Sequence, residues 1–391
     1  MSKIAMKMNK ILLFLMLASG FLLIIYANSD LFSKHFLLRY RKTVPKSTAT
    51  ATTPANVISL AATPRAEAIH APPVQPGGND LEDHQEFNIF IIYTKENYQL
   101  QKKFELFTKS LLKFSTVDKL HLHIISDRKS EVSAEKILKE QIEHYRKSVY
   151  FTFYDVHKSS EKIKDIVQAM MPFFSSNPGS YYSDALFYLS LGLHRIADPQ
   201  MNRAILIDCD IVFRTDVRLL FDEFKHFSTD NIFGLAPELT PVYRHILYRY
   251  RANYPNTSFG SPYFYVTTPG RKHLKHKQHV RHGYPGLNSG IVMLDLKRIR
   301  ESKLFQESLK EEYVQQIANK YMFKGHLGDQ DFYTLLGYEF PSLIFRLDCV
   351  WNRQLCTWWK DHGYSDVFDA YFHCEGNIRI YHGNCNTRVP E

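Results

Sequence analysis

Two carboxylates separated by a single residue follow the most hydrophobic stretch of the chain. Asp208 and Asp210 flank Cys209 and come directly after the apolar residues 204–207. Ligands of open α/β sheets bind beyond the carboxyl ends of strands, so this place suits chemistry better than packing. Carboxylates and substrate phosphates are usual ligands of Mg²⁺ and Mn²⁺. The motif therefore predicts a metal site that stabilises the charge of a nucleoside-diphosphate leaving group.

The Asp-x-Asp pattern is short and occurs widely by chance, so two alternatives stay open. One is a solvated turn at a strand end without any metal. The other is a phosphatase-like site in which the first aspartate is the nucleophile. Cys209 lies between two negative charges that disfavour its thiolate, so we interpret it as a small strand residue.

The elements that must position these residues alternate between strands and helices. Strand patterns at residues 88–94 and 120–127 enclose an amphipathic helix pattern at 100–114. A second helix at about 133–147 precedes the next strand, VYFTFYDV, and a helix at 180–196 precedes the aspartates. This alternation predicts an α/β domain with a mostly parallel sheet that is covered on both faces.

Composition and charge indicate a folded catalytic-sized protein but leave its partner open. The 391 residues are 45% hydrophobic and 14% aromatic, which excludes a disordered chain. The formal net charge of +9 favours an anionic partner such as a nucleotide diphosphate, an acidic glycan or a lipid headgroup. The basic, histidine-rich residues 271–282 either contact such groups or form a solvated loop.

The amino-terminal region predicts a membrane anchor and a linker. Residues 11–27 are uncharged and largely apolar, and as a helix they span roughly 26 Å, which fits a thin membrane. We expect a cytosolic tail at residues 1–10, a signal anchor at 11–27, a stem at 28–85 and a catalytic domain at 86–391. Cleavage after Ala27 as a signal peptide is the alternative.

Four of the five cysteines lie near the carboxyl terminus: Cys349, Cys356, Cys374 and Cys385. In an oxidising lumen they would form two disulfides, for which the sequence allows three connectivities. A zinc site is the alternative, but the usual close Cys-x-x-Cys pairs are absent. One sequon, Asn256-Thr257-Ser258, suits a lumenal surface loop.

An ordered series of sequence blocks resembles glycosyltransferase family 8. The blocks are IFIIYT at 89–94, YSDALFYLSLGLHRI at 182–196, ILIDCDIVF at 205–213, LNSGIVMLDL at 287–296, GDQDF at 328–332 and IYHGN at 380–384. The resemblance covers about residues 87–391. It implies a GT-A fold, that is, a Rossmann-like mixed and mostly parallel sheet flanked by helices. It also implies sugar transfer from a nucleotide donor with retention of configuration.

The resemblance implies which residues bind the metal and the donor. Asp208, Asp210 and His382 match the metal ligands, with Mn²⁺ as the metal and Mg²⁺ as the alternative; an imidazole ligand favours transition metals. The donor-binding set that it implies comprises Tyr93, Thr94, Lys95, Asp184, Cys209, Asn288, Ser289, Gly290 and Asn384.

Structural alternatives exist for most of this set. A buried strand with a polar exit explains residues 93–95, and a helix N-terminal position explains Asp184. We interpret residues 288–290 as a tight polar turn that offers hydrogen bonds to a sugar, although its glycine is also explained by the turn alone.

Asp329 and Gln330 match the family motif near the reacting sugar. Either residue could stabilise an oxocarbenium-like centre while the acceptor hydroxyl attacks from the leaving-group side. The alternative is a covalent intermediate, as in retaining glycosidases. We favour the first mechanism because an amide is a poor nucleophile. The structural alternative is that Asp329 and Asp331 cap a helix.

The sequence departs from the family after His382. The usual ending His-Phe-x-Gly-x-x-Lys-Pro-Trp is replaced by HGNCNTRVP, so the lysine that contacts the donor phosphate is missing. We expect Asn384 to take part of that role and the metal to carry more of the charge compensation.

Residues 347–387 are similar to a branch of the family that adds α1,3-linked xylose to xylose-glucose on EGF-like repeats such as those of Notch. This similarity implies UDP-xylose as the donor and a lumenal site, which we expect at the endoplasmic reticulum membrane, with the Golgi as the alternative. Trp351, Trp358 and Trp359 would form the acceptor platform, unless they are core residues.

Three other functions stay open. They are a family 8 enzyme that uses UDP-glucose or UDP-galactose, a catalytically inactive lumenal glycan-binding protein, and a metal phosphoesterase. No nucleic-acid partner is expected.

Overall fold

The computed structural model describes residues 66–68, 87–176, 185–265 and 280–390, all within one compact unit that begins at Thr63. The expected tail and anchor, most of the expected stem, Asp184 and most of the basic stretch lie outside the described residues. Within the described part of the chain, no helix is both long enough and apolar enough to cross a membrane.

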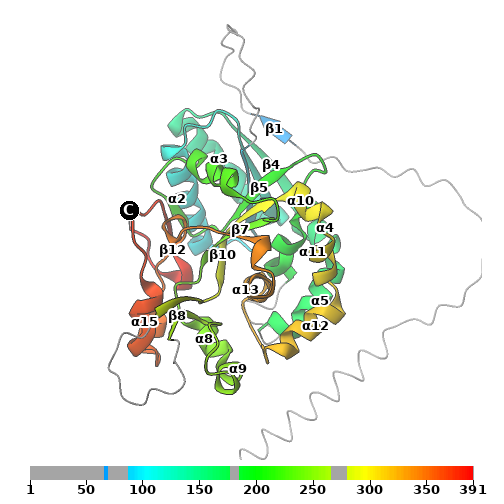
Figure 1. Ribbon diagram of the computed structural model, residues 1–391. Coiled ribbons are helices and arrows are strands. Elements are labelled where there is room, and N and C mark those ends of the chain that lie inside the picture. Colours follow the sequence, from blue (N-terminus) through cyan, green and yellow to red (C-terminus); the bar gives the residue numbers. More distant parts are fainter. Residues whose placement is uncertain (1–65, 69–86, 177–184, 266–279, 391) are drawn as a thin grey trace, which may run out of the picture. The chain divides into compact units, whose positions relative to one another are not determined.

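A mixed sheet forms the centre of the domain (Figure 1). In the described chain its order is β1-β4-β3-β2-β5-β10-β7-β11. The strands are β1 (Ala66–Ala68), β2 (Phe87–Tyr93), β3 (Leu120–Ser126), β4 (Val149–Asp155), β5 (Arg203–Ile207), β7 (Phe233–Pro237), β10 (Leu287–Asp295) and β11 (Ile344–Arg346). β4, β3, β2 and β5 are parallel, whereas β10 runs antiparallel between β5 and β7. The expected mostly parallel sheet is therefore confirmed, and β1 adds an edge strand from within the expected stem.

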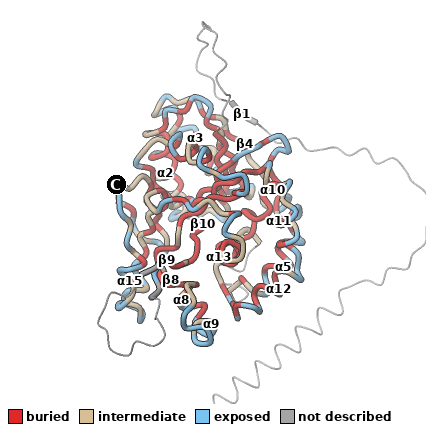
Figure 2. Tube along the Cα trace, in the orientation of Figure 1, coloured by how far each residue is buried: buried red, intermediate tan, exposed pale blue. Residues whose placement is uncertain are grey.

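Two hydrophobic cores cover the two faces of this sheet. Figure 2 shows that the central strands, such as β10, consist largely of buried residues. Side chains alternate along a strand, and in β2 Ile89 and Ile91 join one core while Phe90 joins the other. The first core lies under α2 (Tyr98–Phe114) and α3 (Arg128–Tyr145). The opposite core is packed by α5 (Lys164–Phe174), α10 (Leu296–Glu301), α11 (Lys303–Ser308), α12 (Glu311–Lys320) and α13 (Asp329–Glu339).

Side-chain caps fix where the chain leaves the parallel strands. Asn97 accepts hydrogen bonds from the first backbone N–H groups of α2, and Asp127 does the same for α3. Asp127 also accepts a bond of 2.6 Å from the Lys95 N–H, which holds the exit of β2 against the exit of β3. The expected helix at 180–196 is instead a 3₁₀ helix at Ala185–Gly192 followed by the short α6 (Leu193–Ile196). Gly192, where the two helices meet, packs tightly against Ile163, since a Cβ there would lie 2.1 Å from Ile163 Cγ2.

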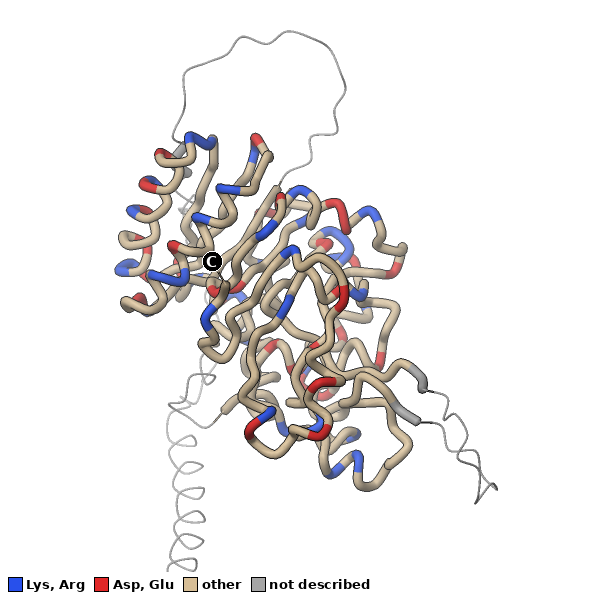
Figure 3. The backbone as a smooth tube through the Cα atoms, turned by 90° about the vertical axis from the view of Figure 1, so that its left-hand side faces the viewer, with Lys and Arg blue, Asp and Glu red and all other residues tan. Residues whose placement is uncertain are grey.

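Six further α-helices and a separate pair of antiparallel strands belong to the described part of the chain. They are α4 (Val156–Glu161), α7 (Arg218–Asp222), α8 (Val242–Ile246), α9 (Tyr248–Asn253), α14 (Trp358–Asp361), α15 (Ser365–Phe372) and the pair of β8 (Ser261–Tyr265) and β9 (Val280–Tyr284). In the view of Figure 3, basic and acidic residues are interspersed along the chain.

A small sheet brings the carboxyl-terminal region next to the aspartates. β6 (Ile211–Phe213) pairs antiparallel with β13 (Ile380–His382), and β12 (Arg353–Gln354) lies on the other side of β13. Two disulfides, Cys349–Cys374 and Cys356–Cys385, brace this region. Of the three connectivities that the sequence allows, this is the one formed.

We predict that the two disulfides contribute similarly to stability, because they close loops of 25 and 29 residues. Loop-closure entropy gives roughly 3 to 4 kcal/mol for each. Chemical denaturation of Cys349→Ala/Cys374→Ala and of Cys356→Ala/Cys385→Ala should therefore show comparable losses in the free energy of unfolding. A loss confined to one pair would contradict the prediction.

Candidate metal and donor site

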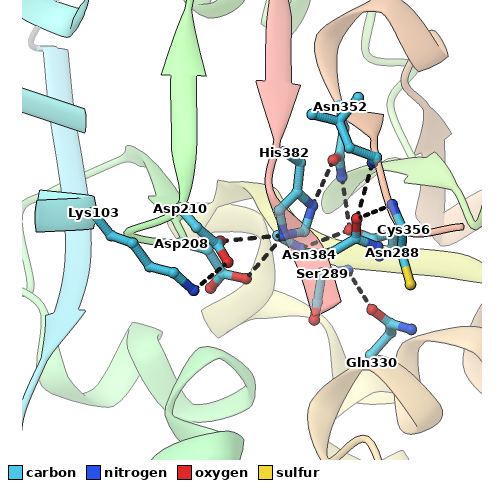
Figure 4. A network of polar contacts seen from close by, with 12 residues as sticks. Lys103, Asp208, Asp210, Asn288, Ser289, Gln330, Asn352, Cys356, His382 and Asn384 are labelled. Atoms are coloured by element: carbon cyan, nitrogen blue, oxygen red, sulfur yellow. Dashed lines mark hydrogen bonds and ion pairs between the residues drawn. The ribbon is translucent and has the colours of Figure 1, made fainter. Parts of the chain in front are cut away.

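Asp208, Asp210 and His382 meet where β5, β6 and β13 approach one another (Figure 4). The Asp208 N–H donates to the carbonyl of Gly290 on β10 at 2.9 Å, and the Gly383 N–H donates to the carbonyl of Asp210 at 2.8 Å. His382 Nε2 then lies 3.4 Å from Asp210 Oδ1 and 3.8 Å from Asp208 Oδ2. One ligand atom from each residue lies within 4.8 Å of the other two.

This set of two carboxylate oxygens and one imidazole nitrogen fits a divalent metal ion. The imidazole is held for that role: His382 Nδ1 donates to Asn352 Oδ1 at 3.0 Å, so Nε2 faces the carboxylates. Gly290 is required beside it, because a Cβ there would lie 2.3 Å from His382 Cε1.

The two aspartates differ in their surroundings. The Asp208 side chain is 56% exposed and the Asp210 side chain 18%. Desolvation by the surrounding protein, and then the charge of Asp210, raise the pKa of Asp208 to about 6. Burial disfavours the Asp210 carboxylate as well, but the hydrogen bond and charge of His382 and the charge of Lys103 outweigh it and lower its pKa. For His382 burial alone would lower the pKa, yet the bond to Asp210 and the nearby carboxylates raise it.

Lys103 is a charged residue of this site that the sequence analysis missed. From α2 its Nζ donates to Asp210 Oδ2 at 3.2 Å (Figure 4). It also donates to Asn386 Oδ1 at 2.9 Å. It supplies a positive charge next to the aspartates in a chain that lacks the family lysine. Nothing in the helix pattern distinguishes it from Lys102, since only the folded chain brings α2 to the residues after His382.

The expected donor residues of the first strand divide into two groups. Thr94 and Lys95 follow β2 directly, at the carboxyl edge of the sheet. Cys209 is buried there too, and its thiol donates to the Ile92 carbonyl at 3.3 Å. The Tyr93 side chain is fully buried and its hydroxyl bonds to Ser133 at 3.2 Å, so the predicted donor contact of Tyr93 is left to its backbone. Its ring therefore belongs to the core under α2 and α3.

Residues 288–290 begin strand β10 instead of forming the expected turn, and the register of β10 against β7 shifts between Asn288 and Val292. The Asn288 side chain is buried and engaged on both sides. Its Nδ2 donates to Glu238 at 2.9 Å, and its Oδ1 accepts from the Gly290 N–H and from Asn352. Direct donor binding by that side chain would break these bonds.

Asp329 and Gln330 lie at the start of α13 and contact Ser289. Asp329 accepts a bond of 3.1 Å from the Ser289 hydroxyl and another from the Ser190 hydroxyl. Burial, and to a smaller extent the charge of Asp208, raise the pKa of Asp329 to about 7. Gln330 Oε1 accepts from the Ser289 N–H at 3.2 Å. The helix-cap alternative is wrong, because Gly328 is the N-cap and no side chain caps α13.

The candidate donor and acceptor residues near the carboxyl terminus differ in burial and in the contacts that their side chains make. Asn384 Oδ1 accepts bonds of 3.0 and 2.9 Å from the N–H groups of Leu355 and Cys356, so its carbonyl fixes the loop beside His382. The acceptor role expected for Trp351 is corrected: it is 1% exposed, and its indole N–H donates to Glu223. Trp358 is 51% exposed on α14, where its ring packs edge-on against Trp359.

Comparison with known proteins identifies relatives over most of the described chain. The family model described as glycosyl transferase family 8 matches residues 88–382. Xyloside xylosyltransferase 1 of Mus musculus is 42% identical over 314 residues, which cover 78% of this chain and 75% of that protein. The Homo sapiens protein of the same name has the same identity and coverage. The crystal structure of the mouse protein in its apo form matches with a TM-score of 0.70 and 41% identity, over 78% of this chain and 100% of that chain. The expected GT-A-like fold is thereby confirmed.

We predict that Asp210→Asn weakens binding of a divalent ion by at least roughly tenfold, because it removes an anionic ligand. Calorimetric titration with Mn²⁺ measures the change. Asp222→Asn is the control, since this carboxylate forms a surface ion pair with Lys225. Equal affinity of Asp210→Asn and the parent protein would exclude the carboxylate as a ligand.

Metal binding should weaken on acidification. Ligands must lose their protons to bind a metal, and the pKa values of His382 and Asp208 are both raised, the latter to about 6. Affinity is therefore full well above the pKa of His382 and is lost as pH falls through it. We expect Mn²⁺ affinity to fall by roughly tenfold or more between about pH 8 and pH 6. An affinity that stays constant over this interval would contradict the assignment, and His382→Gln should flatten the profile.

Proposed function

Because the chain belongs to glycosyltransferase family 8, we propose that it is a retaining xylosyltransferase that uses UDP-xylose as its donor. The observation that carries this proposal is the similarity to xyloside xylosyltransferase 1, at 42% identity over 78% of this chain.

We assign Asp208, Asp210 and His382 to Mn²⁺, with Mg²⁺ as the alternative. When bound, the ion offsets the negative charge that develops on the departing diphosphate. Lys103 contributes a second positive charge beside Asp210. Thr94 and Lys95 receive the uridine at the end of β2, and the Ser289 and Gly290 backbone borders the donor. Asp184 and Asn384 keep the donor-side roles that the family resemblance implies.

The arrangement around Ser289 favours attack by the acceptor hydroxyl from the leaving-group side. Two serine hydroxyls engage the Asp329 carboxylate, which weakens it as a nucleophile. The Gln330 amide is fixed through Ser289 on one side and Glu238 on the other, so its carbonyl dipole is preorganised to stabilise positive charge at the anomeric carbon. The acceptor oxygen bonds to that carbon as the bond to the diphosphate breaks, and the hydroxyl proton passes to the leaving phosphate oxygen.

The acceptor that we propose is xylose-glucose on an EGF-like repeat, as on Notch, with an α1,3 linkage. Residues 347–387 support it by their resemblance to that branch of the family, and the exposed Trp358 offers an apolar surface for a sugar ring, with Trp359 beside it. An endoplasmic reticulum membrane location, with the Golgi as the alternative, is supported by the apolar residues 11–27 and by two disulfides, which persist in oxidising compartments.

We predict that the protein adds one pentose to an EGF-like repeat that already carries xylose-glucose. Mass spectrometry after incubation with UDP-xylose and Mn²⁺ measures the gain, and Asp210→Asn should abolish it because a metal ligand is lost. Parallel reactions with UDP-glucose and UDP-galactose serve as donor controls. A hexose gain would indicate another family 8 enzyme, free phosphate a phosphoesterase, and metal-independent binding without turnover an inactive glycan-binding protein.

A further inference from the structure

A buried chain of hydrogen bonds connects Glu238, at the end of β7, to the metal-site residue His382. Glu238 Oε2 accepts from Asn288 Nδ2 at 2.9 Å, and Asn288 Oδ1 accepts from Asn352 Nδ2 at 2.9 Å. Asn352 Oδ1 in turn accepts from His382 Nδ1 at 3.0 Å. Figure 4 shows the part of this chain from Asn288 to His382. None of the four residues is more than 4% exposed, so water does not compete for these bonds.

The chain has a direction because a carboxylate only accepts hydrogen bonds, whereas an amide both donates and accepts. Glu238 Oε1 accepts from the N–H and the hydroxyl of Thr240, at 3.0 and 2.6 Å. Its Oε2 accepts from Asn288 and, at 3.3 Å, from Gln330 Nε2. Burial raises the pKa of Glu238, and the bonds from Asn288 and Thr240 oppose that rise.

The orientation of each amide, that is, which end donates and which accepts, determines the orientation of the next amide. Asn288 must turn its NH₂ to Glu238, which places its carbonyl toward Asn352 and the Gly290 N–H. Asn352 must then turn its NH₂ to Asn288 and its carbonyl to His382. A carbonyl facing Nδ1 keeps the proton on that nitrogen and leaves the lone pair of Nε2 for the metal.

A second branch starts from the same carboxylate oxygen. Gln330 turns its NH₂ to Glu238 Oε2 and to the Tyr243 hydroxyl, each at 3.3 Å. Its carbonyl therefore faces the Ser289 N–H. Glu238 Oε2, together with the N–H groups of Gly290 and Ser289, thus orients two amides, one leading to the metal and the other to the reacting sugar.

We propose that Glu238 is a positioning residue that sets the tautomer of His382 through Asn288 and Asn352, and sets the Gln330 amide directly. Only the Gln330 branch rests on the proposed function, because the His382 branch concerns metal binding alone.

The variant Glu238→Gln tests this with almost no change in volume. Thr240 holds the new carbonyl at the Oε1 position, so the new NH₂ takes the place of Oε2 and meets two donors, Asn288 Nδ2 and Gln330 Nε2. Relief requires both amides to turn over, which gives up the bonds from the Gly290 and Ser289 N–H groups. Asn352 would then present its NH₂ to His382 Nδ1. Disturbing the partner of a metal-bound histidine typically costs 10- to 100-fold in metal affinity, so we expect a loss of about that size for Mn²⁺ by calorimetry.

Two further variants separate the relay from general damage. Asp331→Asn makes the same carboxylate-to-amide change at a buried residue of α13, which accepts from the Leu327 N–H and from the Tyr243 hydroxyl. Through Tyr243 it contacts the Gln330 branch, whereas Asn288, Asn352 and His382 bond to other partners, so it is a control for the His382 branch. It should leave Mn²⁺ affinity within about twofold of the parent protein. Adding Asn352→Asp to Glu238→Gln restores an acceptor for His382 Nδ1, and the double variant should bind Mn²⁺ at least about fivefold tighter than Glu238→Gln alone.

Asn352→Asp should restore the His382 branch but not the Gln330 branch. Asn352→Asp does not remove the clash between Gln330 and the amide that Glu238→Gln introduces. At saturating Mn²⁺ and donor, both the single and the double variant should therefore keep a kcat for xylose transfer reduced by about tenfold.

Metal affinity in folded Glu238→Gln within about twofold of the parent protein would overturn the proposal. So would a double variant that binds Mn²⁺ no better than Glu238→Gln, or an equal loss in Asp331→Asn. If Glu238→Gln does not fold, the tautomer of His382 in the parent protein tests the proposal instead. With ¹⁵N-labelled histidine in the metal-free protein, at a pH above the pKa of His382, the His382 signal, identified by its absence in His382→Gln, should show a protonated Nδ1, and a protonated Nε2 would refute the relay. These readouts need neither donor nor acceptor, so they remain measurable if the proposed transfer activity fails.

Discussion

The repulsion between Asp208 and Asp210 is the constraint on which the rest of the site depends. Two carboxylates so close together are stable as a pair only when positive charge or hydrogen-bond donors offset them. Without a metal, His382 and Lys103 supply that compensation to Asp210, while Asp208 has a raised pKa. A divalent ion provides the same compensation more strongly. The repulsion between the two carboxylates therefore favours binding of a cation at this site.

The fold supplies this compensation by bringing distant segments to one edge of the sheet. Parallel strands β2 and β5 end side by side, and antiparallel β10 places Gly290 next to Asp208. The pairing of β6 with β13 then fixes His382 opposite the residue that follows Asp210. Because Gly290 has no side chain, the imidazole can approach the β10 backbone closely. Backbone pairing thus determines the positions of the ligands, and buried amides determine their orientation.

The strands of the sheet and the position of the two aspartates could be predicted from the sequence, because local hydrophobic patterns indicate them. Apolar runs mark the buried strands, and the aspartates come directly after one of them. The family resemblance added His382, Asp329 and Gln330, which the structure brings together. The orientation of Tyr93 was beyond the pattern: a continuous apolar run does not indicate which face the last residue takes, and this side chain points into the core.

The errors and omissions elsewhere have similar physical causes. Gly290 resembles a turn glycine locally, but it is required by a ring from a segment far along the chain. Trp351 is one of three tryptophans that differ only in tertiary burial. Lys103, Glu238 and Asn352 act through contacts between separate elements, which no local pattern encodes. The membrane anchor at residues 11–27 stays a prediction.

The Cys356–Cys385 disulfide has a consequence that extends beyond folding. Cys385 follows His382 closely, and the Cys356 N–H is held by Asn384 between them. Oxidation of these thiols and occupation of the metal site therefore act on the same loop. Thermodynamic reciprocity requires that any factor by which the disulfide tightens metal binding is also the factor by which the metal favours the oxidised cysteines. Formation of this disulfide and occupation of the metal site are thus linked through the few residues that join Cys385 to His382.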